Sequence, residues 1–452
     1  MRDLSQGSIN RIILAMATPI AAGMIFQTLY LLVDLYFVAA LGDDAVAGVG
    51  AAGTLMFMVM ALTQILGVSA VAMISQAVGK KNQPEANLVF NQSLVVSGVC
   101  ALITLVIGYG FADSYLNTIT ADVGAHDEGM RFLHWFLPGM ALQFAIMAMA
   151  SSLRATGIVK PGMMIQIITV VLNTILAPVL IAGWGPGPAL GVVGAGLASS
   201  ISVSVGVVLL IWYFLKLEKY VSFEPSLWRP QLHIWRRMLD IGLPAGGEML
   251  LLFAYFSTVY WLIADFGAAA QAGFSIGGRI MQSIFMPTMA IAFALGPIVG
   301  QNFGAGLHDR VKETFYRGIF LCSLVMVVVT GLMQWHSDLL VAFFTDQEDV
   351  IAVGSLFLQL ISWNFVAQGI VFSASGVFQG LGNTRPALVS SLSRIVFFVA
   401  VSLYLKSQPG YTLNQVWYVS IAAVTLQAAI SFVLIRVEFS KRLVRLQPAV
   451  QN

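Results

Sequence analysis

Two acidic residues lie inside long apolar segments, where a charge is costly. Asp34 occurs in LYLLVDLYF and Glu248 in GLPAGGEMLLL. A carboxylate at the centre of a membrane-inserted helix costs about 2.5 to 3.5 kcal/mol on insertion scales, so such residues usually face a cavity or a partner. Both are candidates for binding and releasing a proton or another cation. For Asp34 we favour this function, whereas for Glu248 a structural pairing with a neighbouring helix fits equally well.

Uncharged polar residues surround Asp34 in the expected helical pattern. Helical spacing places Tyr30 and Gln27 one and two turns away on the same face, where they can hydrogen-bond the carboxyl group in either protonation state. Gln27 is also a candidate to line a substrate cavity. Asn173, in VVLNTILAP, is either another member of such a site or an amide that joins two helices. Met147 is one of 20 methionines and fits either an adaptable binding cavity or ordinary packing.

The composition indicates that these residues lie in membrane-spanning helices. Of the 452 residues, 58% are hydrophobic and only 10% are charged, whereas soluble domains carry about a quarter charged residues. Each span needs about 20 apolar residues and must be helical, because lipid offers no partner to backbone groups. The net charge of +2 provides no basic surface for nucleic acid. The first apolar run lacks a cleavage site and predicts a retained span.

Gly, Pro and charged residues divide the apolar sequence into twelve predicted transmembrane helices. The first six lie near residues 11–40, 45–78, 87–110, 130–152, 161–183 and 190–215. The other six lie near residues 238–264, 269–303, 313–334, 352–379, 386–405 and 414–435. This pattern predicts an N lobe at 1–215, a cytoplasmic linker at 216–236 and a C lobe at 237–452.

The distribution of Lys and Arg predicts the orientation, because cytoplasmic loops retain positive charge. With both termini inside, only Arg131, Arg279 and Lys406 are left away from the inner side, and the outer loops collect acidic residues. We therefore predict a multi-pass protein of the inner (plasma) membrane with both termini in the cytoplasm.

The two halves of the chain repeat each other at an offset of 225 residues. Pro19 falls on Pro244, and ISQAVGKKN falls on VGQNFGAGL. Further along, LRATGIVKP falls on FQGLGNTRP. Glycine, proline and basic residues in register over five helices are not a chance similarity between apolar segments, so the halves share one fold.

The repeat predicts an all-α membrane protein of two six-helix bundles, related by a pseudo-twofold axis along the membrane normal. Transporters place substrate and ion sites at such repeat interfaces and alternate access by rocking one half against the other. Pro19 and Pro244 each remove a backbone donor inside a helix and allow it to bend. For Pro244 a fixed bend is equally consistent with the sequence.

Other chemistry finds little support. GVGAAG at residues 48–53 matches a dinucleotide-binding pattern, but no strand precedes it, and a phosphate-binding loop is absent. The five histidines show no metal-ligand spacing, and Cys100 and Cys322 both lie in apolar runs. We therefore expect no enzyme activity, no catalytic residue, no metal and no cofactor, and no obligate protein partner is evident.

Along nearly its whole length the chain resembles the multidrug and toxic compound extrusion (MATE) transporters of the MOP superfamily, prokaryotic type. The matching segments include VDLYFVAALG, ISQAVGKKN, LRATGIVKP, NTILAP, GAGLASS, GFSIGGRI, VGQNFGAG and FQGLGNTRP. The resemblance implies exchange of organic, often cationic, substrates for H⁺ or Na⁺. It also implies that Asp34 is the coupling residue, that Tyr30, Asn173 and Ser199 belong to its site, and that the first helix bends at Pro19.

Two departures from the family pattern affect the choice of ion. Many relatives carry an acid four residues after the asparagine, where this chain has Ala177. Leu252 and Gln368 stand where some relatives have a C-lobe glutamate and aspartate, which leaves Gln368 as a candidate to line the substrate cavity. A single acid favours H⁺ over Na⁺, because a proton needs one oxygen ligand and Na⁺ needs several.

We therefore predict H⁺-coupled export of amphipathic, often cationic, small molecules, with the lipid bilayer as the surrounding partner. Na⁺ coupling at the same site is the first alternative. Flipping of lipid-linked saccharides is expected to need a strongly basic cavity, and few Lys or Arg lie in mid-span. A non-transporting receptor or assembly factor remains as a hypothesis of a different class.

Overall fold

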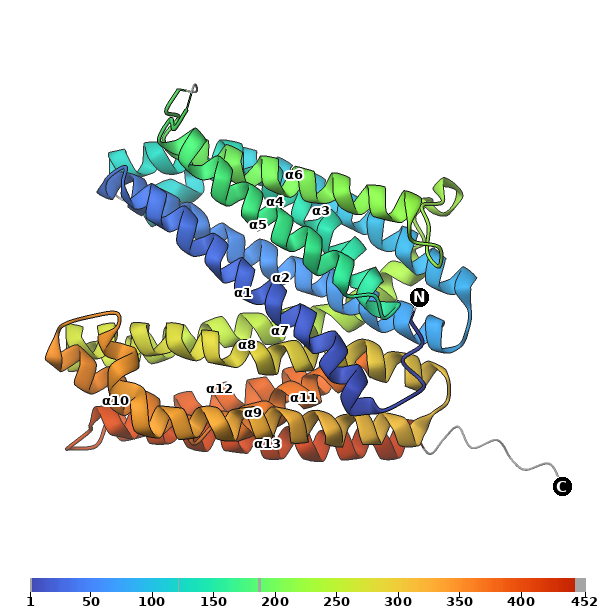
Figure 1. Ribbon diagram of the computed structural model, residues 1–452. Helices are drawn as coiled ribbons and strands as arrows, with labels where there is room; N and C mark the ends of the chain where they lie inside the picture. The colour runs from blue at the N-terminus through green and yellow to red at the C-terminus, as the bar shows by residue number, and fades with distance from the viewer. Residues whose placement is uncertain (1, 121, 186–187, 444–452) are drawn as a thin grey trace. The chain divides into compact units, whose positions relative to one another are not determined.

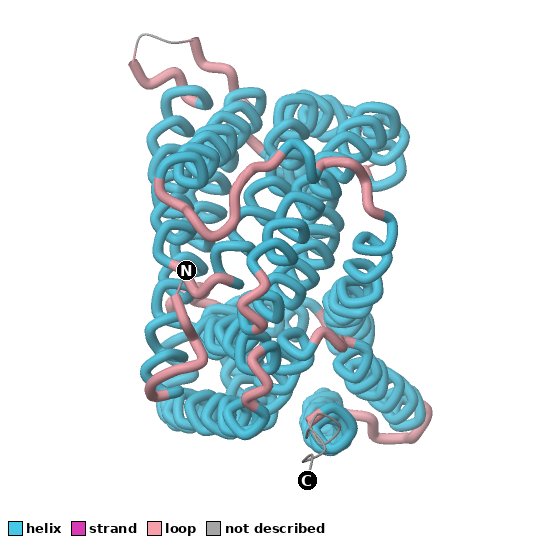
Figure 2. Tube along the Cα trace, turned by 90° about the vertical axis from the view of Figure 1, so that its right-hand side faces the viewer, coloured by secondary structure: helices cyan, strands magenta, loops and turns pink. Residues whose placement is uncertain are grey.

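The computed structural model describes the backbone of residues 2–120, 122–185 and 188–443, with all side chains except those at 30–32, 34, 35 and 57. This part of the chain contains helices and loops but no strand (Figure 2). The helices of the first half are α1 (Ile9–Ala39), α2 (Asp43–Gly79), α3 (Gln83–Ile119), α4 (Val123–Ala155), α5 (Lys160–Ile181) and α6 (Val192–Lys216). A short 3-10 helix, η1 (Pro225–Leu227), follows in the linker.

The second half has the same order of long helices (Figure 1). It consists of α7 (Leu232–Ile263), a 3-10 turn η2 (Ala264–Phe266), α8 (Ala268–Gly304), α9 (His308–Ala342), α10 (Glu348–Ser362), α11 (Phe365–Leu381), α12 (Arg385–Lys406) and α13 (Leu413–Arg442). Eleven of the described helices are long and apolar enough to cross a membrane, and α10 with α11 completes twelve as one span bent by 58°. The prediction of twelve spans in an all-helical membrane protein is thereby confirmed.

The tenth span differs from its prediction as one helix over 352–379. It breaks at Trp363 and Asn364, between α10 and α11. Asn364 donates its side-chain amide to the carbonyl of Ser420 at 3.4 Å, so the polar residue at the break is bound to α13. The equivalent position in the first half is Pro138, yet α4 continues through it.

The helices also confirm the repeat at the level of their ends. α2 and α8 are both 37 residues long, and α5 and α12 are both 22 residues long. The members of each pair begin 225 residues apart, at Asp43 and Ala268 and at Lys160 and Arg385. One fold is therefore built twice from sequences that share mainly their glycines, prolines and loop residues.

Equivalent glycines make equivalent close contacts in the two halves. A Cβ on Gly48 of α2 would lie 2.6 Å from the backbone nitrogen of Gly129 in α4. In the second half a Cβ on Gly273 would lie 2.9 Å from the backbone nitrogen of Gly354. These positions have no space for a side chain, so Gly48 and Gly273 allow their helices to pack closely.

The backbone packs into two compact units that exchange parts of their first helices. Among the described residues, unit 1 contains residues 2–3 and 22–242, and unit 2 contains residues 4–21 and 243–443. The chain thus changes unit close to Pro19, which lies inside α1, and close to Pro244, which lies inside α7. These units differ from the predicted lobes, 1–215 and 237–452, chiefly in the starts of the two first helices.

Within unit 1, buried amides of α3 hold the linker that precedes α7. Asn91 donates to the carbonyl of Ser222 at 2.9 Å and accepts from the backbone of Glu224 at 2.9 Å. Gln92 donates to two linker carbonyls at 2.6 and 2.8 Å and accepts from the backbone of Gln231 and the indole of Trp235. Both amide side chains are fully buried. The linker is therefore fastened to α3.

Within unit 2, residues of α8 and α9 hold the segment that precedes α1. The backbone nitrogen of Leu4 donates to the side chain of Gln301 at 2.9 Å, and Asn302 donates to the carbonyl of Leu4 at 3.3 Å. Arg310 donates to Asn302 at 3.1 Å and to the carbonyl of Gly7 at 3.2 Å. Both first helices thus begin from an anchored segment.

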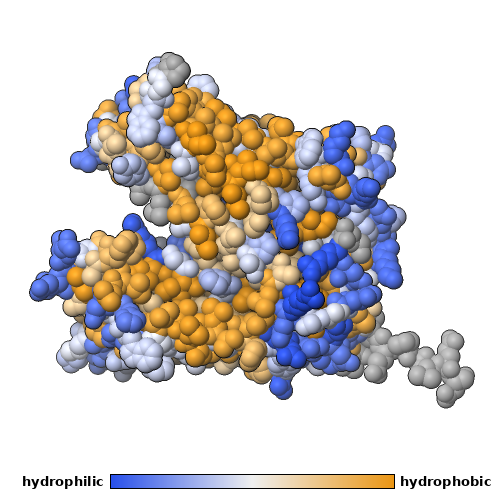
Figure 3. Space-filling view, viewed as in Figure 1, coloured by the Kyte–Doolittle hydropathy of each residue, from blue (hydrophilic) through white to orange (hydrophobic). Residues whose placement is uncertain are grey.

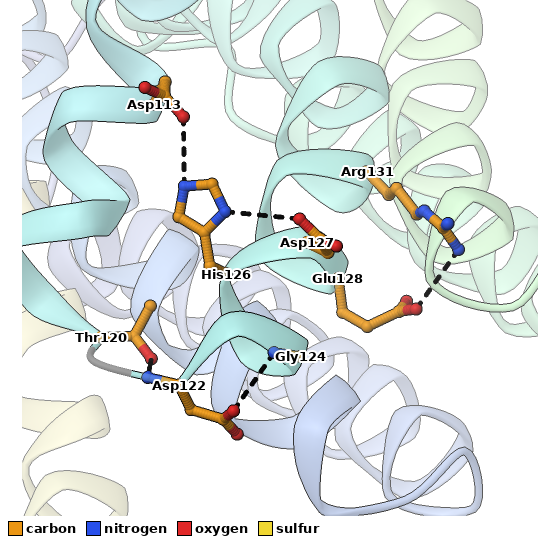
Figure 4. Close-up of polar contacts among 8 residues, drawn as sticks. All are labelled: Asp113, Thr120, Asp122, Gly124, His126, Asp127, Glu128 and Arg131. Carbon is orange, nitrogen blue, oxygen red and sulfur yellow. Dashed lines mark hydrogen bonds and ion pairs between the residues drawn. The ribbon is translucent and has the colours of Figure 1, made fainter.

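The surface pattern of each unit suits a bilayer. On the face shown in Figure 3, apolar side chains cover the middle of the helices of each unit, and hydrophilic side chains gather at the helix ends. Two of the three basic residues predicted away from the inner side are paired with acids. Arg131 lies 3.4 Å from Glu128, and Lys406 lies 2.7 Å from Asp265 (Figure 4 shows the first pair).

The same end of unit 1 carries a histidine between two acids. His126 of α4 lies 3.2 Å from Asp113 of α3 and 3.5 Å from Asp127 of its own helix (Figure 4). Both carboxylates are about two-thirds exposed. This contact joins α3 and α4 at the end predicted to lie outside.

Candidate functional site

The leading candidates, Asp34 and Tyr30, occupy the second half of α1. Their backbone is helical, and this part of α1 belongs to unit 1 together with α5 and α6. Their side chains lie outside the described residues. The roles assigned to both therefore stay predictions.

Two further members of the predicted site, Asn173 and Ser199, lie on the packed pair α5 and α6. Both side chains are fully buried, as is Ala177 one helical turn after Asn173. A polar amide and a hydroxyl are therefore enclosed in unit 1 at the positions that the family resemblance implies. The methyl group of Ala177 supplies no oxygen there.

The three predicted cavity residues have different environments. Gln27 is exposed on α1, and Gln368 is nearly buried in the first turn of α11. Met147 is half-buried, and its sulfur accepts from Ser151 at 3.4 Å and lies 3.7 Å from Nη2 of Arg154. It also packs so closely on Gly67 of α2 that a Cβ there would approach its sulfur to 2.9 Å. The structure thus places Met147 in the contact between α2 and α4, and its role in substrate binding stays a prediction.

The second acid, Glu248, lies in unit 2 in a polar network that the sequence did not reveal. Ser375 of α11 donates to its carboxylate at 3.0 Å, and Ser391 of α12 also hydrogen-bonds to it. Glu248 itself is only partly buried. Within the described part of the chain no Lys, Arg or His forms an ion pair with this carboxylate.

Each of the two serines is bound in turn by an amide. Gln379, one turn after Ser375 in α11, donates to its hydroxyl at 3.4 Å. Gln427 of α13 donates to the hydroxyl of Ser391 at 3.0 Å. The oxygen of Gln427 accepts from Arg394 at 3.4 Å, and this guanidinium lies 3.9 Å from the ring centroid of Tyr255. Arg394 therefore supports the network and does not pair with Glu248 directly.

The repeat allows the two candidate sites to be compared position by position. The residues equivalent to Tyr30, Asp34 and Asn173 are Tyr255, Val259 and Phe398. All three belong to the apolar core cluster of unit 2, where the rings of Tyr255 and Phe398 lie 4.9 Å apart. Conversely, the residue equivalent to Glu248 is Gly23. Neither acid is thus required by the shared fold.

A helical spacing rule would have found part of the Glu248 network. Ser375 and Gln379 are four residues apart, and Ser391 and Arg394 are three apart, so each pair shares a helix face. The convergence of α7, α11, α12 and α13 depends on tertiary packing and was not predictable from spacing. Among the residues that the structure describes, no group of three or more His, Cys, Asp or Glu is placed to hold a metal ion.

Comparisons with known proteins agree with this architecture. The MatE family model matches the chain twice, at residues 19–179 and 244–405, so each match begins at one of the two repeated prolines. The probable multidrug resistance protein YoeA of Bacillus subtilis is 25% identical over 91% of this chain and 90% of its own length. The multidrug export protein MepA of Staphylococcus aureus is 25% identical over 89% of this chain and 88% of its own length.

Solved structures show the same fold. A crystal structure titled MATE in the bent conformation superposes with a TM-score of 0.91 over 98% of both chains, at 22% identity. At that identity the likeness establishes the fold alone.

Proposed function

Because the chain belongs to the MATE family, we propose that it exports amphipathic organic cations across the plasma membrane in exchange for protons, with Asp34 as the coupling carboxyl group. One observation carries this proposal. Unit 1 has an acid in α1 and a fully buried amide in α5, whereas Val259 and Phe398 fill the equivalent positions of unit 2 with apolar packing.

The convergence of the equivalent positions in unit 2 supports a single site in unit 1. Two halves with one fold place equivalent backbone positions together, so positions 30, 34 and 173 are expected to be neighbours. Asp34 then exchanges a proton for substrate as the two repeats alternately expose the site to either side of the membrane.

The composition of this site favours a proton over sodium. Na⁺ is held by several oxygen ligands, and Ala177 supplies none where many relatives have a carboxylate. A proton needs only the carboxyl group of Asp34. The named relatives are multidrug exporters or multidrug resistance proteins, which supports drug-like organic molecules as substrates.

The driving force for this exchange depends on the net charge that it moves across the membrane. One charge that crosses 100 mV releases about 2.3 kcal/mol, but one proton exchanged for one monocation moves no net charge. Export of a monocation is then driven by the pH gradient alone. The two termini and the linker are proposed to lie on the cytoplasmic side, so protons enter in the direction that the cell's gradient drives.

Reconstituted protein with ethidium as the probe tests the ion. A pH gradient without sodium is expected to drive ethidium transport, and dissipating the membrane potential with valinomycin and potassium is expected to leave the rate unchanged. Transport that requires a sodium gradient and ignores the pH gradient would replace the proton with Na⁺. Absence of ethidium flux under either gradient would reject the proposed function.

A further inference from the structure

We propose that Glu248 forms a second binding site, within unit 2, for the positive group of an organic cation, and that Ser375, Ser391 and Gln427 are positioning residues for it. This inference rests on the proposed export of organic cations. It adds to that proposal a substrate-binding carboxylate that is separate from the coupling residue.

The direction of the hydrogen bonds supports an anionic carboxylate at this site. The side-chain oxygen of Gln427 accepts from Arg394, so the NH₂ group of Gln427 faces Ser391. Because Ser391 accepts from that amide, its own hydrogen is available for Glu248. Gln379 and Ser375 make a second arm of the same polarity. Both arms end in hydroxyl groups that donate to the carboxylate, the arrangement that an anion accepts.

The site has a carboxylate without a positive partner in the described chain, and it is poorly suited to a metal ion. Glu248 is only partly buried, and no cation of the described chain pairs with it. A partly desolvated carboxylate inside a span is stabilised by a positively charged partner. Each serine oxygen already accepts a hydrogen bond from an amide, which leaves few oxygen lone pairs to replace the shell of a metal ion. An organic cation needs only the negative charge.

The repeat argues against a purely structural role. Gly23, Ala150 and Gln166 occupy the positions of the first half equivalent to Glu248, Ser375 and Ser391. The first half reaches the same fold without this network. The second half therefore carries a feature that the fold does not need.

Removing the charge of Glu248 while keeping the shape of its side chain tests the proposal. Ethidium and tetraphenylphosphonium serve as substrates because both are permanent monocations. Glu248→Gln is expected to raise the KM for both about tenfold, equivalent to about 1.4 kcal/mol of binding, and to leave kcat near the wild-type value. A higher KM with an unchanged kcat indicates the loss of an interaction that stabilises the ground state and the transition state equally. An unchanged KM, or a fall in kcat at constant KM, would overturn the proposal.

The chain offers matched controls for the positioning residues. Ser391→Ala and Ser375→Ala are expected to raise the KM, and Ser391→Thr, which keeps the hydroxyl, to restore it. The neighbours Ser390 and Ser373 are also buried but bond to the carbonyl of Ala387 and the sulfur of Cys322. Ser390→Ala and Ser373→Ala are therefore expected to leave the KM unchanged. Equal effects of Ser390→Ala and Ser391→Ala would contradict the assigned roles.

Direct binding separates this inference from the proposed function. Quenching of tryptophan fluorescence by tetraphenylphosphonium gives a Kd for purified protein without any transport. A Kd about tenfold higher for Glu248→Gln, with an unchanged melting temperature, supports the site even if the wild type moves no ethidium. Equal Kd values for wild type and variant would reject the site even if the wild type is an exporter.

Discussion

Single residues distinguish two halves that are otherwise built alike. Asp34 has Val259 as its equivalent, and Glu248 has Gly23, so each half carries one acid where the other has none. The sequence identified both acids, because a carboxylate within an apolar run is conspicuous. It did not identify Ser375 or Gln427, because serine and glutamine are common in helices and their convergence on Glu248 arises only from packing.

Asn173 offers a test of the proposed coupling site that leaves the acid in place. Asn173→Leu preserves the size of a fully buried side chain but removes its hydrogen-bonding groups. A hydrogen bond to a charged group contributes about 1.5 to 3 kcal/mol, so we expect kcat/KM for ethidium to fall at least about tenfold. The adjacent Thr174 bonds only to the carbonyl of Val170 in its own helix, so Thr174→Val serves as the control. Equal activity of the two variants would remove Asn173 from the site.

The elements show where sequence reasoning succeeds and where it stops. The length of the apolar segments, and the Gly, Pro and charged residues between them, predicted the spans. The repeat predicted that the spans form two similar bundles. Some predicted spans were too short, such as 87–110 for α3 (Gln83–Ile119), because these helices continue through polar residues beyond the apolar run. The break at Trp363 was missed because it contains neither Gly nor Pro, the signals used to divide the sequence.

Gln92 is expected to determine how firmly the linker is held. Gln92→Leu removes four hydrogen bonds to the linker and the start of α7. At about 0.5 to 1.5 kcal/mol each, their loss should lower the melting temperature and speed tryptic cleavage after Lys219. Gln83 is exposed and makes one bond, to the carbonyl of Tyr220, so Gln83→Leu should have a much smaller effect. Identical cleavage rates for the two variants would refute the fastening role.

Close helix packing in unit 2 gives a second prediction for the elements. A Cβ on Gly376 of α11 would lie 2.4 Å from the carbonyl oxygen of Ala292 in α8. We expect Gly376→Ala to destabilise the protein by about 1 to 3 kcal/mol, as overpacking does. Gly278 of α8 has open space at its Cβ position, so Gly278→Ala should stabilise by up to about 1 kcal/mol through helix propensity. Thermal unfolding in detergent measures both, and equal melting temperatures would contradict the packing argument.

At the scale of the whole molecule, the main feature is the path of the chain between the two units. The chain passes between the packing units after Asp3, Ala21 and Gly242, and the last two points lie within a turn of Pro19 and Pro244. The segments before α1 and α7 are fastened by side chains of α8 and α9 and of α3, respectively. We therefore expect any movement between the units to bend the chain near the two prolines. The sequence indicated the prolines, but the exchange of helix segments follows from tertiary packing alone.

Proline replacement tests this hinge. Pro19→Ala and Pro244→Ala each return a backbone donor to the helix and stiffen it. We expect kcat for ethidium to fall by about tenfold, equivalent to about 1.4 kcal/mol in the barrier, with the KM unchanged. Pro287 lies inside α8, away from any unit boundary, so Pro287→Ala should leave kcat closer to the wild type. If all three variants turn over equally, the prolines near the boundaries have no special role.

The most direct test of proton exchange at Asp34 is the proton flux that substrate itself drives. Proteoliposomes with an internal pH indicator and no sodium are given an ethidium gradient, and the change in internal pH is recorded for wild type and for Asp34→Asn. We predict that ethidium moves protons in the opposite direction through the wild type, and that Asp34→Asn folds normally but moves none. Ethidium-driven proton flux through Asp34→Asn at the wild-type rate would contradict the account.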